Sequence, residues 1–207
     1  MKRRATLAGL CLAPWVLAGC ASSNNEPTRW YELRADPPGP EVPLQPGDGS
    51  IWELVGTVRL PGALDRDTLV VASGAATLLP LAGHRWAEPL RDSIPRLLAA
   101  DLARLRGAGR VWRSPVPTGV AVQRRLRVEI DTLVADAGRR SLHLKARWWL
   151  SDERTSAAAA PETRMADVQV ALPDSSVDTL AAAHRQAIWQ LAQSIVVTSA
   201  SAGRPSR

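Results

Sequence analysis

Three segments in the second half of the chain alternate between apolar and polar residues, and this alternation constrains the fold more than any other feature. The segments lie at 122–131, 142–150 and 168–172. Successive side chains of a strand point to opposite faces of a sheet, so the pattern predicts strands with one buried face. Strands of this kind belong to antiparallel sheets that are covered on one side and face solvent or a partner on the other.

Two longer segments carry a helical period. Apolar residues recur three and four positions apart over 88–106 and 174–198, which predicts two amphipathic helices. Pro89 suits the first turn of the first helix, and Gly107 suits its end. Pro95 conflicts with this helix because an interior proline removes a hydrogen bond. Either the helix bends at Pro95 or its regular part starts there.

The remaining apolar stretches predict shorter strands. A first strand is expected near 29–33 and another at 54–60, while 68–72 and 76–81 flank Ser73-Gly74-Ala75 as a hairpin. The predicted fold class is therefore α/β (α+β). It comprises a single mixed, largely antiparallel sheet of about five to six strands, with the two amphipathic helices packed on one face.

The N-terminus predicts export. Three basic residues (Lys2, Arg3 and Arg4) precede an apolar run that is too short to span a bilayer. The run ends in Leu17-Ala18-Gly19-Cys20, which resembles the bacterial lipobox. That resemblance implies cleavage before Cys20 and acylation of this cysteine, and several acyl chains give stable anchoring where one chain is marginal.

The expected organisation follows from this signal. It comprises a lipoprotein signal peptide at 1–19, a lipidated tether at 20–28 and one domain at 29–198, with a proline-rich loop at 36–50 and a disordered tail at 199–207. Ala21 is not the aspartate associated with retention in the inner membrane. We therefore expect a lipid anchor in the outer membrane, with the domain on the periplasmic side.

Charge and cysteine content narrow the classes of partner. The net charge of +6 falls to +3 once the three basic residues of the signal are removed. A basic chain suggests nucleic acid, but export and the small mature charge argue against that partner. Cys11 would leave with the signal and Cys20 would carry lipid, so the mature domain is expected to have no disulfide.

Motifs for catalysis or metal binding are lacking in the sequence. The three histidines (His84, His143 and His184) stand singly, and His143 and His184 are expected to be solvated rather than ligands. Asp65 and Asp67 could form a carboxylate pair, but ion pairs with nearby arginines are the favoured interpretation. The sequence predicts neither an enzyme nor a cofactor other than the covalent lipid on Cys20.

Tryptophans provide further structural markers. Trp86, Trp112, Trp148 and Trp189 lie beside apolar patterns and are expected in the core, Trp86 as the anchor of the first helix. Trp149 falls on the opposite strand face, among charged residues. An exposed tryptophan with arginine neighbours is typical of a binding hot spot. The alternative is that a loop covers it.

Two short motifs resemble a known family. Residues 58–66 follow a V-x-x-P-x-x-L-D-R pattern and residues 86–90 a W-A-x-P-L pattern, and both are similar to stretches of PqiC-type lipoproteins. The likeness extends over essentially the whole mature chain. Ala72 and Ser73 depart from it, because they replace a frequent aromatic-arginine pair.

The resemblance implies an ABC-type transport auxiliary lipoprotein. Such a protein is non-catalytic, is anchored in the outer membrane and assists an MCE-type protein that bridges two membranes and carries lipid between them. The alternatives are an accessory lipoprotein of another envelope machine, such as lipopolysaccharide export or efflux, and, least favoured, a periplasmic hydrolase.

The candidate partner surface is the turn that contains Leu64, Asp65 and Arg66, with Trp149 as a weaker candidate. A family-like stretch in a turn is harder to explain by packing than one on a core strand. The expected occupant is the MCE-type partner or a second copy of the chain, in a homo-oligomer. The alternative is that Leu64 fills a gap in the core while Asp65 and Arg66 form ordinary ion pairs.

Overall fold

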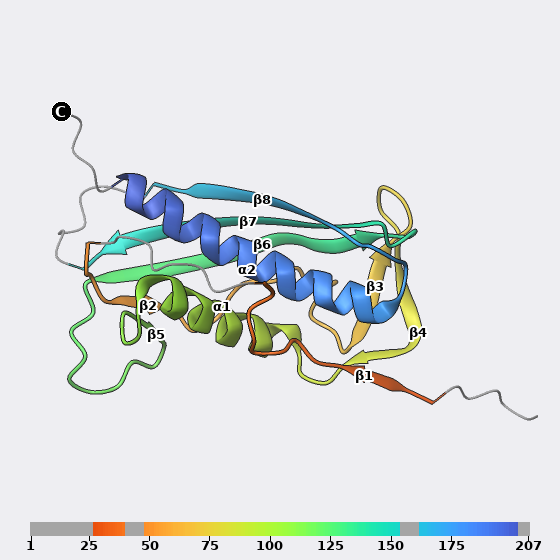
Figure 1. Cartoon of the computed structure of the whole chain (residues 1–207), viewed down its shortest axis with the longest axis horizontal. Helices are drawn as coiled ribbons and strands as arrows, with labels where there is room; N and C mark the ends of the chain where they lie inside the picture. The colour runs from red at the N-terminus through yellow and green to blue at the C-terminus, as the bar shows by residue number, and fades with distance from the viewer. Residues whose placement is uncertain (1–26, 40–47, 154–161, 203–207) are drawn as a thin grey trace, which may run out of the picture.

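The structure is a computed structural model that describes residues 27–39, 48–153 and 162–202. In this part of the chain two helices accompany an eight-stranded sheet (Figure 1). The elements are β1 (Arg29–Tyr31), β2 (Trp52–Leu54), β3 (Thr68–Ala72), β4 (Leu78–Trp86), α1 (Leu90–Arg106), β5 (Val111–Arg113), β6 (Arg124–Asp136), β7 (Ser141–Asp152), β8 (Arg164–Ala171) and α2 (Val177–Ala202).

The three alternating segments form the antiparallel part of the sheet. β6 pairs with β7 and β7 pairs with β8, with Leu126 opposite Leu150 and Val128 opposite Trp148. Burial alternates along all three strands, so their apolar residues line the core and their charged residues face outward. The predicted half-buried antiparallel strands are therefore confirmed.

Parallel strands extend the other edge of β6. β2 pairs with its first residues and β3 with its last, and both run parallel to it. β5 then adds to β2, while β4 forms a hairpin with β3 and pairs with β1. The sheet is mixed, as predicted, but it has eight strands rather than five to six, because several additional strands are only three residues long.

The strand predicted at 54–60 is wrong for most of its length. β2 ends at Leu54, and beyond it the chain meets β6 at single points. The Val55 N–H donates to the Leu126 carbonyl at 3.0 Å, and Arg59 forms an isolated bridge with Glu129. Between these contacts the chain bends near Gly56, so no continuous ladder forms.

Helix α1 resolves the conflict at Pro95. The helix is continuous from Leu90 to Arg106, and Pro95 lies buried inside it. Pro89 precedes the first helical residue. Gly107 ends the helix with a φ of 108°, which favours glycine, and its N–H donates to the Ala103 carbonyl at 2.9 Å.

Helix α2 begins after a side-chain cap. The Thr179 N–H donates to the Ser176 hydroxyl at 3.1 Å. The helix packs on α1, β7 and β8, and it runs to Ala202, beyond the predicted end at residue 198. That both helices cover one face of the sheet stays a prediction. Neither of the two helices in the described ranges is long and apolar enough to cross a membrane.

Tryptophans and one histidine close the core between helices and sheet. Trp86, Trp148 and Trp189 are buried as predicted, whereas Trp112 is only half-buried. The expectation that His184 is solvated is wrong. It lies buried on α2 with its ring edge-on to Trp86, the centroids being 5.1 Å apart. This contact joins the start of α1 to α2.

Candidate functional site

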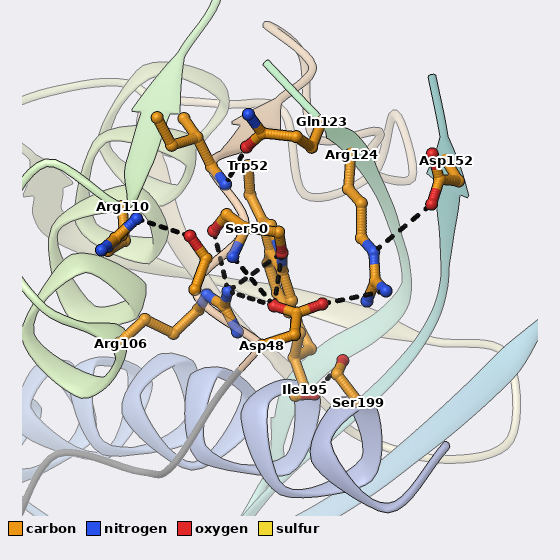
Figure 2. A network of polar contacts seen from close by, with 12 residues as sticks. Asp48, Ser50, Trp52, Arg106, Arg110, Gln123, Arg124, Asp152, Ile195 and Ser199 are labelled. Carbon is orange, nitrogen blue, oxygen red and sulfur yellow. Dashed lines mark hydrogen bonds and ion pairs between the residues drawn. The ribbon is translucent and has the colours of Figure 1, made fainter. Parts of the chain in front are cut away.

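A polar network lies where α1 ends beside β2, β5 and β6 (Figure 2). The Asp48 carboxylate is its centre. One oxygen accepts from the Ser50 N–H at 3.0 Å and from the Ser50 hydroxyl at 2.5 Å, and the other pairs with Arg124 at 2.9 Å. Partial burial acts to raise the pKa of Asp48, but the Ser50 hydrogen bonds and Arg124 outweigh it and hold the pKa below its usual value.

Arg106, in the last turn of α1, also belongs to this network. Its guanidinium lies 3.6 Å from the centroid of the buried Trp52 ring, which is cation–π geometry, and donates to the Ser50 carbonyl at 3.0 Å. Trp52 in turn donates its Nε1–H to the Ser50 hydroxyl at 2.8 Å. Burial lowers the pKa of Arg106, with Asp48 acting in the opposite direction. Arg106 thereby fixes the chain at Ser50 to the end of α1.

A shallow cavity of about 350 Å³ opens beside these residues. Arg110 and Arg124 line it together with Asp48 and Asp152, so cationic and anionic groups are both present. Arg110 donates to the Gly49 carbonyl at 2.5 Å, and Arg124 lies 4.0 Å from Asp152. Because the arginines are already paired, the arrangement holds loops together.

A second ionic cluster lies between the helices. Arg185 of α2 forms two hydrogen bonds with Asp101 of α1, each 2.7 Å long, and both side chains are buried. The same guanidinium donates to the Arg34 carbonyl at 2.9 Å. Arg104 donates to the carbonyl of Ala35, the next residue, also at 2.9 Å. Burial raises the pKa of Asp101, with Arg185 acting in the opposite direction. This cluster fastens the segment after β1 to both helices.

The predicted turn is divided between core and surface. Leu64 is only 6% exposed and belongs to the core, so its side chain is not available to a partner. Asp65 pairs with Arg91 of α1 at 3.0 Å, and Asp67 pairs with Arg85 at 2.5 Å. The favoured interpretation of these aspartates as members of ion pairs is therefore correct, although the partners are distant in sequence. Arg66 is exposed and forms no ion pair with any residue in the described ranges.

Trp149 lies on β7 opposite Arg127 of β6, on the charged side of the sheet. It is half-buried, so it is neither covered fully nor projecting into solvent. Charged neighbours surround it, including Arg147, which pairs with Glu129 at 2.8 Å. Its place on this face matches the prediction from the strand alternation. Cys20, the predicted lipidation site, lies outside the described residues.

Sequence reasoning missed the Asp48 network. Its members come from a loop, the end of a helix and the start of a strand, and these three segments are far apart in sequence. The one local signal was the Asp48-Gly49-Ser50 turn, since Asp and Ser bond neighbouring backbone groups in turns. Within the described ranges, no group of three or more His, Cys, Asp or Glu side chains is placed to hold a metal ion.

Fold and site together define a small mixed α/β body with paired charges at both ends of α1. The chain belongs to the family described as the ABC-type transport auxiliary lipoprotein component, whose sequence pattern it matches over residues 31–196. The match spans the described fold from the end of β1 to the last turns of α2. A search of curated proteins finds no match.

Two solved structures share the fold. A crystal structure titled as an uncharacterized protein aligns with a TM-score of 0.64 at 17% sequence identity, covering 84% of this chain and 99% of that one. Protein XCC0632 from Xanthomonas campestris, assigned to the DUF330 family, aligns with a TM-score of 0.62 at 19% identity, covering 85% of this chain and 97% of that one. At these identities the likeness establishes the architecture.

Proposed function

We propose that this protein is an outer-membrane lipoprotein, acylated on Cys20, that serves on the periplasmic side as a non-catalytic auxiliary subunit of an MCE/ABC-type lipid transport system. The observation that carries the proposal is the family match over residues 31–196, which covers nearly the whole described fold. The lipobox-like Leu17-Ala18-Gly19-Cys20 supports the lipid anchor.

A short tether suits an auxiliary role. The described chain begins at Pro27, and β1 follows directly at Arg29. Nine residues from Cys20 to Arg29 reach at most about 30 Å when fully extended. The domain would therefore stay close to the membrane, where a high effective concentration allows a modest interface to hold a partner.

The partner surface that we propose comprises the outward-facing part of the turn, Asp65 and Arg66, with Trp149 as a second contact. Both residues of the turn are exposed, and Arg66 has no ion-pair partner in the described part of the chain. The Asp65–Arg91 pair is partly exposed, and such pairs contribute at most about 1 kcal/mol to stability. The charge of Asp65 can therefore be reversed without unfolding the domain.

Charge reversal tests this surface. Asp65→Arg and Arg66→Glu are expected to reduce recovery of the MCE-type partner in affinity purification at least tenfold, while the melting temperature stays within about 3 °C of the parent. Arg113→Glu reverses an exposed charge on β5 and serves as the control. Full recovery of the partner with both turn variants would show that the turn is ordinary solvated surface.

A further inference from the structure

Exposed apolar residues lie at two places near the end of the molecule where β1 begins. Five large hydrophobic side chains of the described residues are exposed, and three of them lie on β1 and β4: Trp30 at 62%, Leu78 at 37% and Leu79 at 44%. Trp30 is in register with Arg85 near the end of β4, and it lines a hollow beside Ala181 of α2. Leu78 and Leu79 open β4 directly after the turn of the β3–β4 hairpin.

The hairpin lacks the alternation that marks the other long strands. The first three residues of β4, Leu78-Leu79-Pro80, are all exposed, so both faces of this stretch meet solvent. Its neighbour β3 is buried at Leu69, Val70 and Val71. The apolar residues of β4 therefore project beyond the core instead of completing it. Exposed apolar side chains of this kind are available to a binding partner.

The position of β1 in the chain indicates what the exposed apolar residues bind. The described chain begins at Pro27, directly before β1, which pairs with β4 (Figure 1). Ten residues separate Trp30 from Cys20, a span of at most about 35 Å when extended. A lipid on Cys20 would hold this end of the molecule, rather than the opposite end, against the bilayer.

Basic residues lie near both groups of exposed apolar residues. Arg29 precedes Trp30 and is exposed, without an ion pair to any described residue. Arg140 lies in the β6–β7 turn and is 88% exposed. This turn is next to the hairpin, because Ala72 at the end of β3 pairs with Asp136 at the end of β6. Tryptophan at the headgroup level and arginine beside anionic lipid are both favourable at a membrane surface.

We propose that this end of the fold is a membrane-docking face, in which Trp30, Leu78 and Leu79 enter the headgroup region while Arg29 and Arg140 contact lipid phosphates. The inference rests on the proposed lipid anchor and adds an orientation to it. The opposite end, with the Asp48–Arg106–Arg124 network, then points away from the bilayer.

Site-specific labelling tests the orientation. In the mature, acylated protein the thiol of Cys20 is blocked and Cys11 is gone, so a new cysteine is the single free thiol. Leu79→Cys places an environment-sensitive NBD label on the docking face, and Ala108→Cys places it in the exposed turn after α1, at the opposite end (Figure 1). The protein is reconstituted into vesicles of phosphatidylethanolamine with one quarter phosphatidylglycerol.

The label at position 79 should gain fluorescence at least twofold in vesicles and be quenched by nitroxide-labelled lipid, whereas the label at position 108 should respond to neither. Solvent-like fluorescence at both positions of an acylated protein would overturn the docking face and leave the anchor intact. Equal quenching at both positions would also overturn the orientation. A label at position 79 that is shielded only after addition of the purified MCE-type partner would identify a protein interface instead.

Intact mass spectrometry of the same samples separates this inference from the function on which it rests. A mass without acyl chains would contradict the anchor, and quenching at position 79 in a Cys11→Ser, Cys20→Ser background would still support the docking face. Absence of both acylation and quenching would contradict both.

Discussion

At the scale of single residues, His184 shows how far burial can change the chemistry of a side chain. The imidazole lies between α2 and Trp86, and its Nδ1–H donates to the Leu180 carbonyl, with the two heavy atoms 2.8 Å apart. Burial lowers the pKa of His184 to about 4, although the bond to Leu180 acts in the opposite direction. The folded protein therefore holds this ring neutral where an unfolded chain would protonate it.

This difference predicts a loss of stability in acid. Below an unfolded-state pKa of about 6.5 the unfolded chain binds a proton that the folded chain does not, so stability falls as the pH drops from 6.5 towards 4. The contribution amounts to about 3 kcal/mol. Denaturant titrations at pH 7.5 and 4.5 measure it, with His184→Asn as the control that cannot titrate. The stability of the variant should change less with pH, and parallel curves for the two proteins would contradict the buried neutral ring.

Residue-scale features also mark the limit of reading a sequence. Leu64 lies in a turn beside Asp65 and Arg66, and nothing local indicates that it is buried. His184 lies four positions from both Leu180 and Ile188, so the helical period does place it on the buried face of α2, although its side chain is polar. Their burial depends on what packs against them. For His184 that neighbour is Trp86, which is distant in sequence because α1 and strands β5 to β8 lie between them in the chain. Trp148, by contrast, was placed correctly because the strand period alone determines its side of the sheet.

At the scale of elements, the long ones follow from the sequence and the short ones do not. β6, β7, α1 and α2 each contain several repeats of their own period, so their apolar faces are visible in the sequence. β2 and β5 have three residues each, which is too few for a period. They exist because neighbouring backbone is available: the Trp52 N–H donates to the Arg110 carbonyl at 2.9 Å, and the Ser114 N–H to that of Leu54 at 3.0 Å.

Trp86 is the element-scale test, since it connects the end of β4 to the helices. Trp86→Ala is expected to cost about 3–5 kcal/mol, because truncating a buried aromatic removes contacts and leaves a cavity. In a domain of this size that corresponds to a melting temperature lower by about 10 °C. Trp112→Ala, at a half-buried tryptophan on β5, is the matched control and should cost far less. Equal losses for the two variants would argue against Trp86 as the anchor.

At the scale of the whole molecule, the fold separates the N-terminal attachment from the polar network (Figure 1). β1 and the β3–β4 hairpin lie at one end, and the end of α1 with β2 and β5 lies at the other. An elongated body with distinct ends suits a protein that holds a partner at a defined place near a membrane. The prediction at this scale therefore concerns the proposed lipid anchor.

Cys20→Ser tests the anchor. The variant is expected to remain an uncleaved precursor, since the lipobox-like signal requires the thiol for acylation before cleavage. The parent protein should be recovered with outer-membrane vesicles on a density gradient, and its mature mass should include acyl chains. Ser22→Ala changes a residue two positions further on and is the matched control, which should be processed normally. Normal cleavage of Cys20→Ser, or recovery of the parent with inner-membrane vesicles, would contradict the predicted anchoring.

The Arg185 cluster also has a mechanical consequence. Any force applied at the N-terminus enters the fold through β1, which has only three residues and pairs with β4 alone among the described strands. The next residue that is held is Leu33, which is buried in the core, and after it come the carbonyls of Arg34 and Ala35, held by Arg185 and Arg104. Because Arg185 is locked to Asp101, a pull that strips β1 from the sheet and Leu33 from the core then meets charge-assisted bonds to both helices. The cluster therefore resists force that is transmitted from the N-terminal segment to the rest of the domain.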